Sequence, residues 1–231
     1  MKSQDVLILF KLISLELQAR GKRVKKREFA VMQDSQGSII STVNQLLDSD
    51  GDIQAVKLAD LEDWRGWDDN EPIEQDNQQS YSVRALASAL GLSKTEVSSS
   101  LSRCREIGLV FTDNTDGSLL VRKKALLDLI TYSIRYIFPA KPGPIVRGIP
   151  TAFAAPILAG KVISGGEFIP VWPDAYGKSK GQEITPLYKT VPEAVKKDEL
   201  LYHFLALVDA IRIGGPREAK VADAMLREWI L

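Results

Sequence analysis

The sequence predicts a mainly α-helical protein with one small β-hairpin. Three observations support this fold class. Apolar residues recur at helical spacing over long segments near both ends of the chain. Residues 82–106 have the pattern of two short helices joined by a tight turn, and residues 109–122 that of two short strands around a turn cluster. We expect one domain over residues 1–124, and a mostly helical, loop-rich region over residues 125–231.

The first helix is expected from Ser3 to about Arg20. Val6, Leu7, Phe10, Ile13 and Leu17 give it a wide apolar face, so its predicted role is to pack behind the helix pair. A basic run follows, with six Lys or Arg among residues 20–27. This run is either a solvated turn or a second contact for phosphate groups.

Residues 28–80 form a predicted insertion between the first helix and the helix pair. From Asp48 to Asp76 it holds eleven Asp or Glu against Lys57 and Arg65, together with Trp64 and Trp67. The composition of residues 71–80 is typical of a disordered segment. The insertion is either an acidic, partly ordered loop or a segment that covers a basic surface of the protein.

The helix pair is predicted from its end signals. Ser82 can cap the first helix, and Gly91 can end it because glycine adopts a left-handed conformation at little cost. Ser93 and Glu96 match a capping box, which starts a second helix at Lys94. Its inward face holds Val97, Leu101 and Cys104, and its outward face is expected to hold Lys94, Thr95, Ser98, Ser99, Ser102 and Arg103.

Two strands are predicted directly after this second helix. Residues 109–112 and 118–122 flank the turn cluster Asp113-Asn-Thr-Asp-Gly117. Residues 81–124 are mildly basic, with seven Lys or Arg and four Asp or Glu. The basic side chains at the base of the hairpin are Arg122, Lys123 and Lys124, whereas Asp113 and Asp116 lie at its tip.

These residues resemble the winged helix-turn-helix of MarR-like bacterial transcriptional regulators. The match covers residues 82–124 and rests on Leu-Ala at 86–87, Leu-Gly-Leu-Ser-Lys at 90–94, Val-Ser at 97–98, Leu101, Arg103 and Gly-Leu-Val at 108–110. The resemblance implies binding of double-stranded DNA, with the second helix in the major groove. The outward face of the second helix would contact DNA through Lys94, Thr95, Ser98, Ser99, Ser102 and Arg103. Phosphates would be held by Arg84, Arg122, Lys123 and Lys124. The remainder of the chain is similar to stretches of uncharacterised bacterial winged-helix proteins.

The C-terminal region is predicted to contain three long helices and an irregular segment. The first helix spans residues 123–138, and in winged-helix regulators a helix at this place often forms a homodimer. Residues 139–192 contain nine of the eleven prolines but many apolar residues, so we expect an ordered, wrapping segment with a short hairpin at 161–172. Arg135 and Arg147 could bind its backbone or an anionic ligand. Helices then follow from Glu199, capped by Asp198, to about Ile213, and from Arg217 to Ile230.

Composition and motifs argue against several classes of protein. The net charge is zero, there is one cysteine and one histidine, and we find no phosphate-binding loop and no zinc-ligand pattern. We expect no cofactor, no metal and no catalytic residues. The sequence has no signal-peptide pattern and no transmembrane stretch, so a cytoplasmic protein without membrane contact is expected.

The predicted function is therefore a DNA-binding regulator, a homodimeric repressor of its own or a neighbouring operon. Small regulators of this kind often control toxin–antitoxin or phage-defence genes, which is an association and not a physical argument. The alternative is an antitoxin-like or adaptor protein that uses the winged helix and the acidic strip to bind a protein partner.

Overall fold

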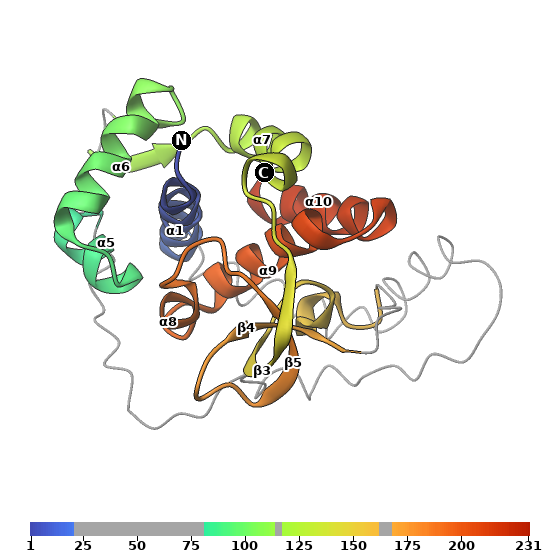
Figure 1. The fold of residues 1–231 in the computed structure, drawn as a ribbon. Helices are drawn as coiled ribbons and strands as arrows, with labels where there is room; N and C mark the ends of the chain where they lie inside the picture. Colours follow the sequence, from blue (N-terminus) through green and yellow to red (C-terminus); the bar gives the residue numbers. More distant parts are fainter. Residues whose placement is uncertain (21–80, 114–116, 162–167) are drawn as a thin grey trace.

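The computed structural model describes residues 1–20, 81–113, 117–161 and 168–231. The predicted acidic insertion, the basic run after Arg20 and the tip of the hairpin at 114–116 lie outside these residues. Helices dominate the described part, together with a few short strands (Figure 1). The prediction of a mainly α-helical chain with some β structure is confirmed at this level.

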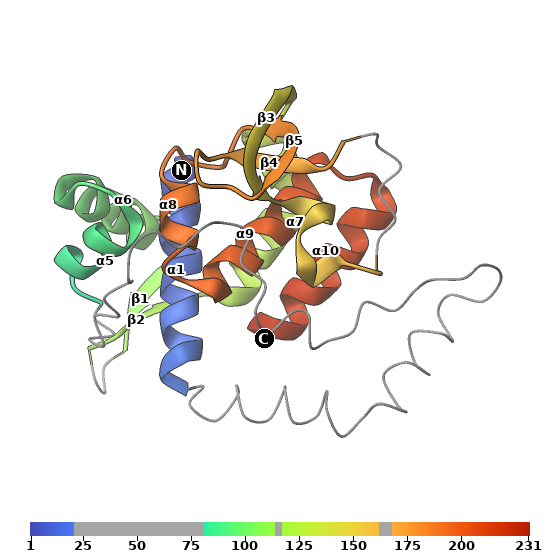
Figure 2. The same ribbon diagram turned by 90° about the horizontal axis from the view of Figure 1, so that it is seen from below.

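Helix α1 (Ser3–Arg20) is the central element of the fold. Every residue from Asp5 to Glu16 is buried, as expected for a helix that other elements surround. Figures 1 and 2 show α1 between the α5–α6 pair and the C-terminal helices, and α1 contacts α5, α6, β2 and α9. The predicted packing behind the helix pair is confirmed, and α1 also packs against the C-terminal region.

The elements between residues 83 and 121 follow the predicted order. Helices α5 (Val83–Leu90) and α6 (Lys94–Glu106) are followed by strands β1 (Val110–Thr112) and β2 (Leu119–Val121). The two strands pair antiparallel, with Val110 opposite Val121 and Thr112 opposite Leu119. Apolar residues from these elements and from the C-terminal region belong to one continuous core.

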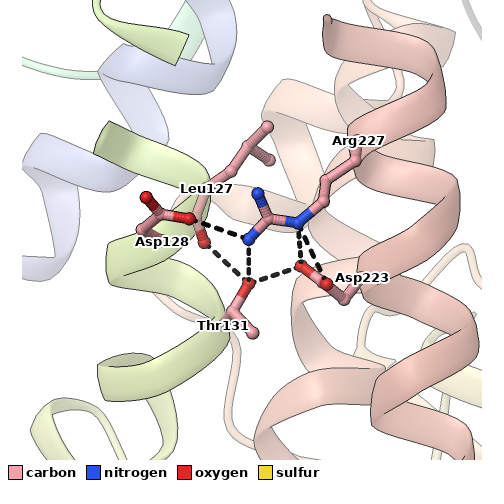
Figure 3. Close-up of polar contacts among 5 residues, drawn as sticks. All are labelled: Leu127, Asp128, Thr131, Asp223 and Arg227. Atoms are coloured by element: carbon pink, nitrogen blue, oxygen red, sulfur yellow. Dashed lines mark hydrogen bonds and ion pairs between the residues drawn. The ribbon is translucent and has the colours of Figure 1, made fainter. Parts of the chain in front are cut away.

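Helices α7 (Lys123–Ile137), α9 (Glu199–Ile213) and α10 (Pro216–Ile230) pack against one another. Arg227 on α10 links two of them: it bonds Asp128 of α7 at 2.9 Å and Asp223 of its own helix at 3.0 Å. Thr131 of α7 donates to Asp223 and to the Leu127 carbonyl (Figure 3). The structure thus contains the three long helices that the sequence predicts in this region.

Three strands replace the irregular segment predicted at 139–192. Strand β3 (Pro142–Pro150) pairs antiparallel with β4 (Pro170–Pro173) and with β5 (Ser179–Ile184), and β4 pairs parallel with β5, so the sheet closes on itself. The short 3-10 helices Ala152–Ala154 and Pro156–Leu158 follow β3. Within the expected 161–172 hairpin, Pro170, Val171 and Trp172 instead belong to β4 and pair with β3 and β5.

The many prolines explain why the sequence predicted an irregular segment at 139–192 and not a sheet. Proline lacks the N–H group that a strand ladder needs, so a proline-rich segment favours a loop. Here Pro142, Pro150, Pro170 and Pro173 stand at strand ends, and the pairing is irregular between Pro142 and Ile145, where Pro144 lies. The prolines therefore occupy the positions that tolerate them.

A buried polar network joins the sheet to α9. Asp209 accepts hydrogen bonds from Trp172 Nε1 at 2.6 Å, Thr151 Oγ1 at 3.1 Å and Arg212 at 2.5 Å. Burial raises the pKa of Asp209, and the charge and hydrogen bond of Arg212 offset this only in part. Nearby, Tyr202 donates to the Pro150 carbonyl at 2.8 Å.

Arg135 and Arg147, whose partners the sequence left open, both bind backbone. Arg135 donates to the Ile211 carbonyl at 2.8 Å and to the Gly214 carbonyl at 2.6 Å, so it satisfies the C-terminal end of α9. Arg147 donates to the Gly177 carbonyl at 2.5 Å. Among the described helices, none has the length and apolar character needed to cross a membrane.

Candidate nucleic-acid interface

The turn between α5 and α6 forms through local hydrogen bonds. Ser82 accepts from the Ala85 amide at 3.2 Å and caps α5. Gly91 has a φ of 62°, and the Leu92 amide donates to the Ala87 carbonyl at 3.0 Å, which ends the helix. The predicted cap and the predicted glycine stop are both confirmed.

The capping box at the start of α6 is present as predicted. The Glu96 amide donates to Ser93 Oγ at 3.1 Å, and the Ser93 amide donates to Glu96 Oε2 at 2.9 Å. Glu96 also accepts a hydrogen bond from the Tyr188 hydroxyl at 2.8 Å. The bonds from the Ser93 amide, the Ser93 side chain and Tyr188 lower the pKa of Glu96 to about 2.

Helix α6 separates an apolar inner face from a polar outer face. Val97, Ser100, Leu101 and Cys104 are buried. Burial raises the pKa of the Cys104 thiol to about 11, so the thiol stays protonated and unreactive at neutral pH. The outer face exposes five of the six predicted contact residues: Lys94, Thr95, Ser98, Ser99 and Ser102.

Arg103 does not belong to the exposed face, which corrects the prediction. Its guanidinium group bonds Asp5 of α1 through two contacts, Nε at 3.1 Å and Nη2 at 2.6 Å. Ser100 donates to the same carboxylate at 2.5 Å. Burial alone would raise the pKa of Asp5, but the bonds from Arg103, Ser100 and the Lys2 amide outweigh it and lower that pKa.

The residues predicted to contact phosphates also fall into an exposed group and one residue that is held by an acid of α1. Arg84, Arg122 and Lys124 are exposed. Lys123 instead bonds Glu16 of α1 at 2.9 Å, with only 17% of its side chain exposed. Arg122 also lies over the Phe111 ring, 6.0 Å from its centroid. Arg103 and Lys123 are therefore held by acidic residues of α1, and the other predicted basic side chains face solvent.

Sequence reasoning missed one exposed basic residue on α6 and a group of residues near that helix. Arg105 is exposed and follows Ser98 and Ser102 at helical spacing, a pattern that the sequence contains. Tyr188, Lys189 and Lys197 lie about 100 residues further along the chain, and no local pattern places them beside α5 and α6. In the described part of the chain, no cluster of His, Cys, Asp and Glu is arranged to hold a metal ion.

Comparisons with protein-family models, with curated proteins and with solved structures found no match for this chain.

Proposed function

We propose that this protein is a winged helix-turn-helix regulator that binds double-stranded DNA. In this proposal α1, α5 and α6 form the three-helix unit, α6 enters the major groove, and the β1–β2 hairpin is the wing. The observation that carries the proposal is the outer face of α6. It presents a lysine, a threonine and three serines to solvent, and such side chains bond phosphates and base edges.

The electrostatics of α6 also support binding to an anion. The only acid on α6 before Glu106 is Glu96, and its carboxylate is engaged by the Ser93 amide and the Tyr188 hydroxyl. The positive end of the helix dipole lies at this N-terminus. Arg84, Arg122 and Lys124 are exposed around the helix pair and would contact the sugar–phosphate backbone.

Homodimerisation through α7 completes the proposal. Ala125, Leu129, Tyr132 and Tyr136 recur at the four-three-four spacing of a helix–helix seam. Tyr132 is 72% exposed and Tyr136 is 79% exposed, while the opposite side of α7 binds α9 and α10. A second copy offers a helix of the same spacing, and a two-fold dimer would place two α6 helices about 34 Å apart, one turn of DNA.

Fluorescence anisotropy would test DNA binding. We would compare a labelled duplex from upstream of the gene with an unrelated duplex, at a low and a high salt concentration. A Lys94→Ala/Ser98→Ala/Ser99→Ala variant removes only exposed side chains and is expected to weaken binding to the upstream duplex about tenfold or more. Lys220→Ala on α10 is the control. Equal, weak binding to both duplexes by wild type and variant would refute the proposal.

Sedimentation would test the dimer. A Tyr132→Glu/Tyr136→Glu variant is expected to be monomeric at concentrations where the wild type is dimeric, because two carboxylates would be placed in the seam. A wild type that remains monomeric would contradict the proposed dimer. The exposed tyrosines would then favour the second candidate function, a module that binds another protein, since a large exposed apolar surface commonly marks a protein contact.

Repression of the chain's own or a neighbouring operon remains part of the proposal. It rests on the resemblance of residues 82–124 to MarR-like regulators. A reporter gene placed behind the upstream region would test it, with increased expression expected in cells that carry the Lys94→Ala/Ser98→Ala/Ser99→Ala variant.

A further inference from the structure

A segment of the C-terminal region lies against the turn of the helix pair. This segment comprises Tyr188, Lys189 and helix α8 (Val191–Val195), and it ends at Lys197. Figures 1 and 2 show α8 beside α5, and the two helices are in contact. A Cβ atom placed on Gly91, at the turn itself, would lie 3.5 Å from the side chain of Thr190. The segment is therefore packed against the turn.

One short hydrogen bond and a buried helix face hold the segment in this position, and one long contact lies at its end. The Tyr188 hydroxyl donates to Glu96 of the capping box at 2.8 Å. Lys197 Nζ lies 3.4 Å from the Ser88 carbonyl of α5. Between these two contacts, α8 buries Val191, Pro192, Ala194 and Val195. Lys189 and Lys197 therefore stand at the two ends of a segment that packs against α5 and the N-terminus of α6.

The charges of the segment form a basic extension of the helix pair. Lys189 and Lys197 are both exposed, and Lys189 lies close enough to Glu96 to contribute to lowering its pKa. Lys196 is excluded from this surface because it bonds Asp174 at 2.6 Å. Glu193 is the one acid on α8, and it lies 3.5 Å from Lys196. The long, weak contact of Lys197 with a neutral carbonyl leaves its charge available to an anion.

We propose that Lys189 and Lys197 bind DNA phosphates beside the groove that α6 enters. The inference rests on the proposed function and extends it, because it assigns part of the DNA interface to the C-terminal region. The ligand is the sugar–phosphate backbone of double-stranded DNA, so the two lysines contribute affinity but no sequence preference. Tyr188 acts as a positioning residue, since its bond to Glu96 holds Lys189 next to the N-terminus of α6.

A salt series measured by fluorescence anisotropy would test this inference. Each phosphate contact contributes about 0.9 to the slope of log affinity against log salt concentration. The Lys189→Ala/Lys197→Ala variant is therefore expected to lose about two units of slope, and to bind the upstream and unrelated duplexes more weakly by the same factor. Lys189→Arg/Lys197→Arg keeps both charges and is expected to retain the wild-type slope.

The controls separate this inference from the proposed function. Lys220→Ala removes an exposed lysine on α10, far from the turn in sequence, and is expected to leave the slope unchanged. If the wild type binds DNA and loses binding in the α6 variant, but Lys189→Ala/Lys197→Ala matches Lys220→Ala, the inference is overturned and the proposed function stands. If the wild type does not bind DNA, both fail. A Tyr188→Phe variant with a reduced slope would support the positioning role, and an unchanged slope would refute it.

Discussion

The helix pair α5–α6 and the sheet with α9 are stabilised by two different kinds of contact. In the helix pair, Ser82 bonds the amide three residues on, and Ser93 and Glu96 bond each other across three residues, all in exposed positions. In the sheet region, Asp209 bonds Thr151 and Trp172, which lie 58 and 37 residues away, and the network is buried.

This difference has consequences for stability and for function. Exposed caps form from neighbours along the chain and contribute about 1 kcal/mol each, whereas a buried charge that loses its partner destabilises by several kcal/mol. The helix pair can consequently present its outer face to a ligand while the buried contacts of α1, α9 and the sheet maintain the fold. Substitutions in both regions test this comparison.

Asp209→Ala is expected to lower the free energy of unfolding by about 3–5 kcal/mol. The substitution leaves the buried Arg212 guanidinium without its carboxylate, and the Trp172 and Thr151 donors without an acceptor. Urea unfolding followed by circular dichroism would measure the change. Glu193→Ala, on a side chain that is 67% exposed, is the control and is expected to change stability by no more than about 0.5 kcal/mol. A loss below about 1 kcal/mol in Asp209→Ala would contradict the comparison.

Gly148→Ala and Gly91→Ala form a matched pair for the two regions. A Cβ atom on Gly148 would lie 2.0 Å from the Trp172 carbonyl oxygen, so β3 and β4 must separate, at a cost of about 3 kcal/mol. A Cβ atom on Gly91 meets no such obstacle and costs about 1 kcal/mol for the left-handed backbone. Urea unfolding of both variants would check the order, and a larger loss in Gly91→Ala would overturn it.

Arg103→Ala tests one of the long-range contacts of the helix pair, the bond between Arg103 of α6 and Asp5 of α1. It leaves the buried Asp5 carboxylate with only the Ser100 hydroxyl and the Lys2 amide. Because Arg103 is 28% exposed, we expect a loss of about 2 kcal/mol. DNA affinity measured well below the unfolding temperature is expected to stay within about twofold of the wild type. A large, specific loss of DNA affinity without loss of stability would show that Arg103 contacts DNA after all.

Glu96→Gln tests the capping box through the pH dependence of stability, where the smallest effect is expected. The pKa of Glu96 is lowered to about 2 in the folded protein, so its contribution to stability is present above the unfolded pKa and is lost as pH falls toward 2. The glutamine variant does not titrate at this position. The difference in stability between wild type and variant, measured by urea unfolding, is therefore expected to shrink as pH falls from about 5 to 2. A difference that does not change with pH would contradict the capping-box assignment.

Much of the fold could be predicted from residues close together in the sequence. The apolar spacing within α1, the cap Ser82, the stop at Gly91 and the capping box of Ser93 and Glu96 were all predicted and are present. The same holds for α9 with its cap Asp198, and for the exposed face from Lys94 to Ser102. Capping bonds and helical turns join residues three or four positions apart, so a short stretch of sequence contains all the information they need.

Contacts between distant residues could not be predicted in this way, because they depend on how the helices and strands pack. Asp5 and Glu16 on α1 bind Arg103 and Lys123, two side chains that the local pattern assigned to DNA. The ladder of β3 with β4 and β5 forms where proline and glycine favour a loop. The packing of α8 places Thr190 beside the turn at Gly91 and Lys197 beside Ser88 of α5. In each case the partner is supplied by the fold, because burial of the apolar core brings together segments that no local sequence pattern connects.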